Sequence, residues 1–263
     1  MFSFAASFGP DFTITFRPLE LSIETSFILL TFATMLPGLY CVCAYPESRS
    51  SLRKLNASWK LYLAAIATGL ILPFTSYFGT RHPEFPWGRE ALAQLGRVFA
   101  LNLFLAPFWE EIVWRGCFLN KVRSLYPASG GILLMSVGWT LWHGGYIAYL
   151  YSKGMPANVL YIYTPTVFCI GILLGSVFEL GRASLWPCVL LHTSFNAATA
   201  VYYSEYGRAS ELGSYVSELV FVAIAAAVFS RSHFDAAANR SLHPGFPGSD
   251  LDGGLESGSW GHW

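Results

Sequence analysis

Ionisable side chains occur inside an apolar stretch of this 263-residue sequence, FLAPFWEEIVWRGCFL, which carries Glu110, Glu111 and Arg115. A charged side chain near the centre of a bilayer costs roughly 2.5–3.5 kcal/mol even on lenient insertion scales. These three residues should therefore face a protein interior or a wet cavity. On a helix, Glu111 and Arg115 are i,i+4 neighbours and can pair. Glu110 lies about 100° around the helix and has no partner on it, so we predict that Glu110 is the residue available for chemistry.

Two further apolar stretches contain histidines. In SVGWTLWHGGYIAYL, His143 stands in the middle of the run, and Trp139 lies four residues earlier on the same helical face. In SLWPCVLLHTSFNAATAVYY, His192 and Asn196 are i,i+4 and project from one face. Taken singly, each feature has a structural explanation: a charged helix end at the interface, a packing histidine, or a His–Asn hydrogen bond between helices. Their occurrence in three separate stretches favours a shared site.

If these groups converge, the chemistry they could perform is hydrolysis. A desolvated carboxylate is a competent general base toward water, and one imidazole can help to hold that water. A second imidazole and an amide N–H can stabilise the oxyanion of a tetrahedral intermediate.

The composition indicates the elements that must position these residues. Of all residues, 54% are hydrophobic and 12% charged, whereas a soluble domain carries about 25% charged residues. Such a chain has too few polar side chains to cover the surface of a water-soluble protein, so we predict an integral membrane protein. The formal net charge is zero, which does not suggest a nucleic-acid partner.

We predict an all-α, polytopic transmembrane helix bundle. The N-terminal segment would cover 1–24, the helical domain 25–230 and a disordered polar tail 231–263, which is rich in Gly, Ser, Pro and Asp. About seven runs approach the ~20 residues that span a bilayer: 25–45, 59–78, 96–118, 130–151, 159–180, 184–203 and 213–230. The fifth and sixth are separated only by 181–183, which predicts a tight helical hairpin. Internal prolines are expected to kink these helices more often than end them. The loops on the side of the membrane that carries the C-terminus contain slightly more Lys and Arg than those on the other side, which predicts a cytoplasmic C-terminus.

At the polar residues, the sequence resembles the CAAX-protease and bacteriocin-processing (Abi) family of intramembrane peptidases. The family's first motif, two glutamates, three residues and an arginine, reads Glu110 to Arg115. The second is an aromatic residue four before a histidine, here Trp139 and His143, although the aromatic residue is normally phenylalanine. The third, a histidine four before an asparagine, reads His192 and Asn196. The resemblance covers about 95–203.

The resemblance implies a helical membrane glutamic endopeptidase that needs no cofactor or metal. Glu110 would be the base and His143 would help to place the water. His192 and Asn196 would form the oxyanion site, while Glu111 and Arg115 hold the helix in register. The expected partners are a peptide or protein substrate, lipidated or not, and membrane lipids.

Three alternatives stay open. Glu110, His143 and His192 could bind zinc with one open position, although the chain lacks HExxH spacing. The acidic residues and histidines could form a proton relay in a transporter, or the chain could be a non-catalytic membrane scaffold.

Overall fold

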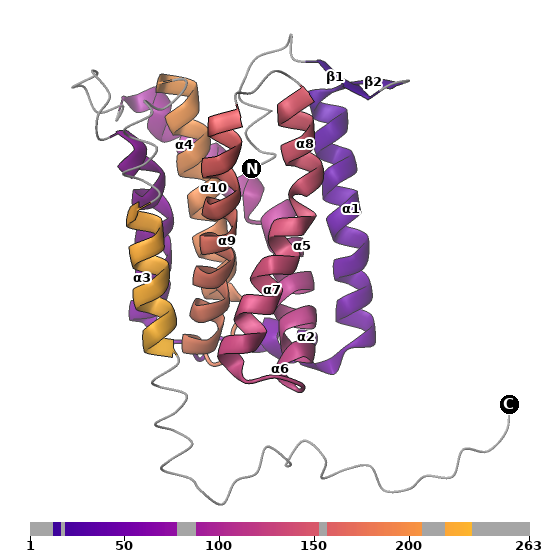
Figure 1. The fold of residues 1–263 in the computed structure, drawn as a ribbon, viewed down its shortest axis with the longest axis vertical. Helices are drawn as coiled ribbons and strands as arrows, with labels where there is room; N and C mark the ends of the chain where they lie inside the picture. Colours follow the sequence, from indigo (N-terminus) through magenta and orange to yellow (C-terminus); the bar gives the residue numbers. More distant parts are fainter. Residues whose placement is uncertain (1–12, 17–18, 78–87, 153–156, 207–218, 233–263) are drawn as a thin grey trace, which may run out of the picture.

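The computed structural model is a bundle of helices (Figure 1), and it describes residues 13–16, 19–77, 88–152, 157–206 and 219–232. The chain begins with a short antiparallel hairpin of β1 (Thr13–Phe16) and β2 (Leu19–Ser22), in which Thr13 lies opposite Ser22. The helices that follow are α1 (Ile23–Ala44), α2 (Pro46–Arg53), α3 (Trp59–Ile71), the 3₁₀-helix η2 (Leu72–Tyr77), α4 (Arg89–Asn102), α5 (Ala106–Glu111), the π-helix η3 (Ile112–Leu119), α6 (Asn120–Arg123), α7 (Ala128–Trp142), α8 (Gly144–Ser152), α9 (Ala157–Leu180) and α10 (Trp186–Tyr206). A last apolar helix spans Leu219–Ser232. The helical prediction is confirmed for the bundle, and the hairpin is the exception to it.

The apolar runs of the sequence coincide with these helices, but few of them are long. Judged by length and hydropathy among the described residues, one helix segment, Tyr163–Leu180, could cross a membrane alone. A second crossing is possible if α4 and the segment Ala106–Arg123, which meet at a bend of 42°, count as one broken span. Phe32–Ala44, Trp59–Ile71 and Leu219–Ser232 are apolar but shorter. The number of seven spans therefore stays a prediction. The predicted tail lies outside the described residues from 233 onward.

The prolines act in different ways. Pro37 and Pro165 lie inside α1 and α9, which continue past them. Pro107 instead stands at the start of α5, after a break in the run 96–118 that was predicted as one span. Because proline has no N–H and its ring clashes with the carbonyl four residues earlier, the helix stops near Leu103 and restarts at Ala106. The break sets the direction in which the next segment, with the two glutamates, enters the bundle.

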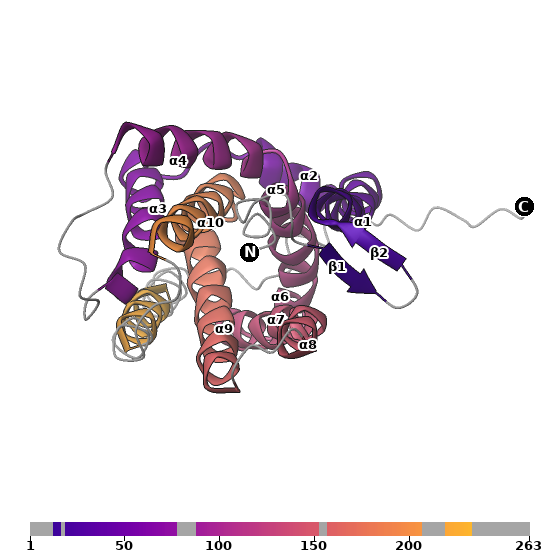
Figure 2. The ribbon, with the colours of Figure 1, turned by 90° about the horizontal axis from the view of Figure 1, so that it is seen from above.

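Helix α10 is the centre of the bundle, and from Pro187 to Val201 nearly every residue is buried. It packs on α3, α4 and α9, and Figure 2 shows it enclosed by its neighbours in the view from above. The closest approach is at Gly69 of α3, where an added Cβ would lie 2.5 Å from the carbonyl oxygen of Leu191. Glycine at this position lets the backbones of α3 and α10 meet, because there is no room for a side chain.

Helices α7 and α9 also meet through small residues. Gly171 and Gly175 are spaced as in a GxxxG pattern, and an added Cβ at either would come within 3.0 Å of Ser136 or Ile132 of α7. The two helices can therefore approach closely, which brings the chain segments around Trp139 and Gly171 together.

The predicted tight turn between the fifth and sixth spans is present between α9 and α10. The amide of Ala183 donates to the carbonyl of Phe178, and the amide of Gly181 donates to that of Val177. Arg182 and Ala183 adopt positive φ angles of 55° and 62°, so two non-glycine residues take the left-handed conformation that reverses the chain.

Candidate active site

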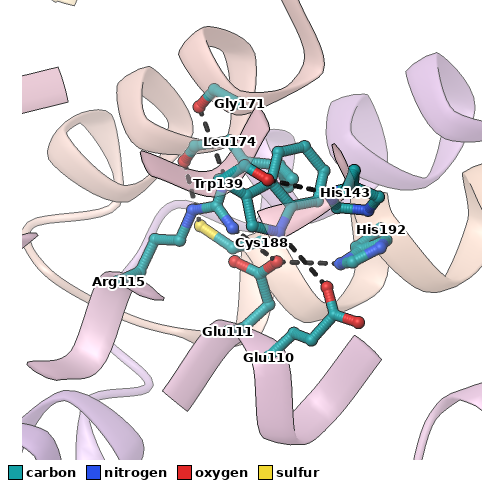
Figure 3. A network of polar contacts seen from close by, with 9 residues as sticks. All are labelled: Glu110, Glu111, Arg115, Trp139, His143, Gly171, Leu174, Cys188 and His192. Carbon is teal, nitrogen blue, oxygen red and sulfur yellow. Dashed lines mark hydrogen bonds and ion pairs between the residues drawn. The ribbon is translucent and has the colours of Figure 1, made fainter. Parts of the chain in front are cut away.

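The predicted site residues come from four segments of the bundle. Glu110 and Glu111 end α5, Arg115 lies in η3, Trp139 lies in α7 with His143 just after it, and His192 and Asn196 lie in α10. All of them are buried, and Glu111 and Arg115 have no exposed surface. Figure 3 shows six of these residues close together in a network of polar contacts, in which Arg115 lying over the Trp139 ring joins two hydrogen-bonded groups.

Glu111 and Arg115 form the ion pair that their spacing predicts. Arg115 Nη1 donates to Glu111 Oε1 at 3.0 Å. Arg115 Nη2 donates to the carbonyl of Gly171 in α9 at 3.4 Å, and the guanidinium lies over the Trp139 ring at 4.9 Å from its centroid. A buried guanidinium needs such partners because an unpaired charge in the interior is costly. The pair therefore joins η3 to both α7 and α9.

Glu111 has a second partner that the sequence did not indicate. His192 Nδ1 lies 2.8 Å from the same Oε1 atom that Arg115 contacts. A carboxylate oxygen accepts, so Nδ1 carries a proton and donates to it. Helix register is thus only part of what Glu111 does: it also fixes the orientation of the His192 ring across 81 residues of sequence.

Glu110 is held by Trp139. The indole Nε1–H donates to Glu110 Oε2 at 3.2 Å, and among the described residues Oε1 has no hydrogen-bond partner. The Trp139 ring also meets both imidazoles nearly edge-on, with centroids 4.7 Å from His143 and 5.6 Å from His192. Trp139 is therefore the common neighbour of Glu110, Arg115 and the two imidazoles, and not simply the wall of a pocket.

His143 was predicted in mid-helix, but it lies at the junction of α7 and α8. Its backbone has φ −76° and ψ −7°, and two glycines open α8 directly after it. Its Nδ1 atom is 2.8 Å from the carbonyl oxygen of Trp139. Because a carbonyl can only accept, the proton is on Nδ1, and the lone pair of Nε2 is left to accept a hydrogen bond from another group.

Asn196 lies one helical turn after His192 and is buried. Its side chain makes no hydrogen bond with any residue that the structure describes, so its carboxamide is free to bind another group. The network in Figure 3 does not include it.

The sequence did not indicate the residues whose side chains hydrogen-bond to the backbone of η3. Ser48 of α2 donates to the carbonyl of Gly116 at 2.8 Å, and Asn120 donates to the same carbonyl at 2.9 Å. In a π-helix the backbone hydrogen bonds join residues i and i+5, and such segments are frequent at functional sites. Here two side chains stabilise the π-helix next to Arg115. A serine in a short polar segment gives no sequence signal for this role.

A metal-binding arrangement is not found in the part of the chain that the structure describes: no three His, Cys, Asp or Glu side chains there could hold a metal ion together. The zinc alternative stays open to experiment.

Comparison with known proteins shows a family whose model matches part of the chain. The family model described as type II CAAX prenyl endopeptidase Rce1-like matches residues 93–198, a segment that includes every predicted site residue from Glu110 to Asn196. No curated protein matches the chain.

Proposed function

We propose that this chain, which belongs to the CAAX-protease family by its match over residues 93–198, is an intramembrane endopeptidase in which Glu110 activates the attacking water. The family match supports a CAAX-type endopeptidase. The observation that carries the glutamate mechanism is the placement of Glu110, whose Oε2 is held by Trp139 at 3.2 Å and whose Oε1 is left for water.

The water would be bound between Glu110 and His143. Since His143 donates through Nδ1 to the Trp139 carbonyl, its Nε2 is an acceptor and can take one hydrogen of the water. Glu110 takes the other hydrogen as a proton while the water oxygen attacks the scissile carbonyl carbon. Both groups are anchored to Trp139, one by its indole and one by its backbone, so their separation is held constant.

The developing oxyanion needs donors, and His192 can be one of them only through Nε2. Its Nδ1 proton is already donated to Glu111, so a ring that also donates from Nε2 is an imidazolium. The free carboxamide of Asn196 would supply the second donor.

The reaction is completed when the tetrahedral intermediate collapses. The oxyanion re-forms the C=O bond as the C–N bond breaks, and the proton on Glu110 passes to the leaving amine. The new carboxylic acid then releases its remaining proton, which came from the water, to become the carboxylate. One water is consumed and no oxidant or reductant is needed. The family description favours a prenylated C-terminal peptide as the substrate, and the catalytic groups themselves would serve any peptide bond that reaches them.

The experiment uses the full chain in liposomes and follows cleavage of a prenylated tail peptide. Glu110→Gln, His143→Ala and His192→Ala should each abolish turnover, while the exposed α4 residue Glu90, changed to Gln, should leave it unchanged. Retained cleavage in all three site variants would show that the groups are not catalytic. Loss of activity with a chelator, restored by zinc, would favour the metal alternative instead.

The same proposal includes a multi-pass arrangement with the C-terminus in the cytoplasm. The apolar helices support it, and labelling of single cysteines introduced at 240 and 89 from each side of sealed vesicles would test it. Labelling of position 240 from the outside only would contradict it.

A further inference from the structure

The end of the bundle that carries α2 and α6 has a concentration of basic side chains that are exposed or half-buried. Hydrogen bonds bring the segments at this end together: Asn120 Nδ2 donates to Ser51 Oγ at 3.2 Å, and Leu185 N donates to the carbonyl of Ser51 at 3.2 Å. Ser184 Oγ donates to the carbonyl of Lys54. The end of α2, the start of α6 and the α9–α10 turn are therefore one continuous surface, at the lower end in Figure 1.

We call the basic residues of this surface the basic rim, which consists of Arg53, Lys54, Lys60, Lys121 and Arg182. Within the described parts of the chain, none of them forms an ion pair. Of the acidic residues there, Glu179 is already paired with Arg123 at 3.0 Å, and Glu47 stands exposed on α2. The rim thus has a clear excess of positive charge without an internal counter-ion.

Large apolar side chains lie exposed among these charges. Leu55 is 70% exposed and Trp59 66% exposed, and the Lys60 ammonium lies over the Trp59 ring at 5.9 Å. Leu125 and Tyr126, just beyond α6, are also exposed. Exposed apolar groups mixed with tryptophan, tyrosine and lysine are typical of the boundary between headgroups and hydrocarbon.

We propose that the basic rim binds the headgroups of anionic phospholipids. Anionic headgroups provide the negative charge that the rim lacks, and the neighbouring Leu55 and Trp59 can enter the lipid layer beside them. An acidic peptide would match the charge but would leave these apolar side chains exposed to water.

Hydrogen bonds connect this surface to the candidate active site. Helix α2 contacts η3 through the bond from Ser48 to the Gly116 carbonyl, and it contacts the start of α10 through Trp186 Nε1, which donates to the carbonyl of Leu52 at 2.9 Å. Lipid bound at the rim would therefore stabilise the segment that joins the two helices carrying Arg115 and His192.

The test uses the full chain in phosphatidylcholine vesicles with trace dansyl-labelled phosphatidylglycerol or dansyl-labelled phosphatidylcholine. Energy transfer from tryptophan gives the relative association of the two lipids. We expect the anionic lipid to be preferred, since each basic residue near an anionic surface is worth roughly fivefold in association. The triple change Arg53→Gln, Lys60→Gln and Lys121→Gln should lower the preference by at least about fivefold, and high ionic strength should remove it in the unchanged chain.

The matched control is Arg89→Gln with Arg97→Gln on α4, two exposed residues on a helix that Figure 1 places at the opposite end of the bundle from α6. It should keep the lipid preference. The proposal is overturned if phosphatidylglycerol is not preferred, if the triple variant keeps the preference, or if the control loses as much. An acidic peptide that binds the rim while the labelled lipid does not would also overturn it. Because the readout is lipid association, the result does not depend on peptidase activity.

Discussion

Replacing Trp139 by phenylalanine removes one hydrogen bond from the centre of the site and keeps an aromatic ring there. The indole N–H that holds Glu110 Oε2 is lost, while a phenyl ring still covers the Arg115 guanidinium, which lies 4.9 Å from the ring centroid. Phenylalanine is also the usual residue at this place in the family pattern that the sequence resembles. The substitution therefore tests what this chain gains from tryptophan.

The size of the effect follows from the geometry. A hydrogen bond to a charged group contributes about 1.5–3 kcal/mol, and the length of 3.2 Å is at the long end for N–H···O bonds. We therefore expect a loss of about 1.5 kcal/mol of transition-state stabilisation, which corresponds to roughly tenfold in rate. Since the proposed role of Glu110 is to activate water and not to bind the peptide, the loss should fall on kcat and leave KM nearly unchanged.

The assay is steady-state cleavage of the tail peptide by the reconstituted chain, with thermal unfolding measured on the same samples. Trp142→Phe is the matched control, because it removes an indole from the same helix at a side chain that is 46% exposed. It should keep both kcat and KM. Melting temperatures of the two variants show whether lost activity reflects lost structure.

Two results would refute the reasoning. If Trp139→Phe cleaves as fast as the unchanged chain, the indole does not position Glu110. If KM rises while kcat is constant, Trp139 acts in substrate binding, and the proposed anchoring of the base is wrong.

Three further predictions concern stability and can be measured by unfolding in mild detergent. Glu111→Gln should cost about 3–5 kcal/mol, because it leaves the buried guanidinium of Arg115 without its counter-charge; an unchanged unfolding free energy would show that the pair is not needed. Gly69→Ala should cost about 1–3 kcal/mol and lower activity, since its Cβ would lie 2.5 Å from a backbone oxygen of α10, whereas Gly96→Ala, whose Cβ would meet open space in the middle of α4, should stabilise the chain by about 0.5–1 kcal/mol. Ala183→Gly should stabilise the chain by roughly 1 kcal/mol because it relieves a φ of 62°; a loss of stability would contradict this.

The sequence indicated well the features that depend on neighbours along one helix. The Glu111–Arg115 pair at 3.0 Å and the tight turn at 181–183 follow from spacing alone. The positions of the apolar helices follow in the same way from hydrophobic runs. The number of membrane spans does not follow from the sequence, because the length and hydropathy of an apolar run do not show whether a proline interrupts the helix. Helix α9 continues past Pro165, whereas the helix before Pro107 breaks.

The features that the sequence did not indicate are contacts between helices far apart in the chain. Trp139 and Glu110 are 29 residues apart, and His192 and Glu111 are 81 residues apart. Each bond depends on the way in which α7 and α10 pack beside the segment after Pro107. Helical periodicity places a side chain on a face, but it does not name the residue that this face will meet.

The contacts between distant helices change the roles that we assign to the two glutamates. From the sequence, Glu110 is the base and Glu111 neutralises Arg115, so the second residue could be regarded as structural. In the structure, Glu111 Oε1 accepts from both Arg115 and His192, and the carboxylate that balances the guanidinium also fixes which nitrogen of His192 is left to act. Loss of Glu111 should therefore disturb both the fold and His192, the proposed oxyanion donor. A charge-balanced double substitution, Glu111→Gln with Arg115→Met, separates the two effects: it should recover the stability lost with the single change because no buried guanidinium is left without a counter-charge, yet leave peptide cleavage impaired because His192 has lost its anionic partner. Full recovery of cleavage would show that Glu111 is structural after all.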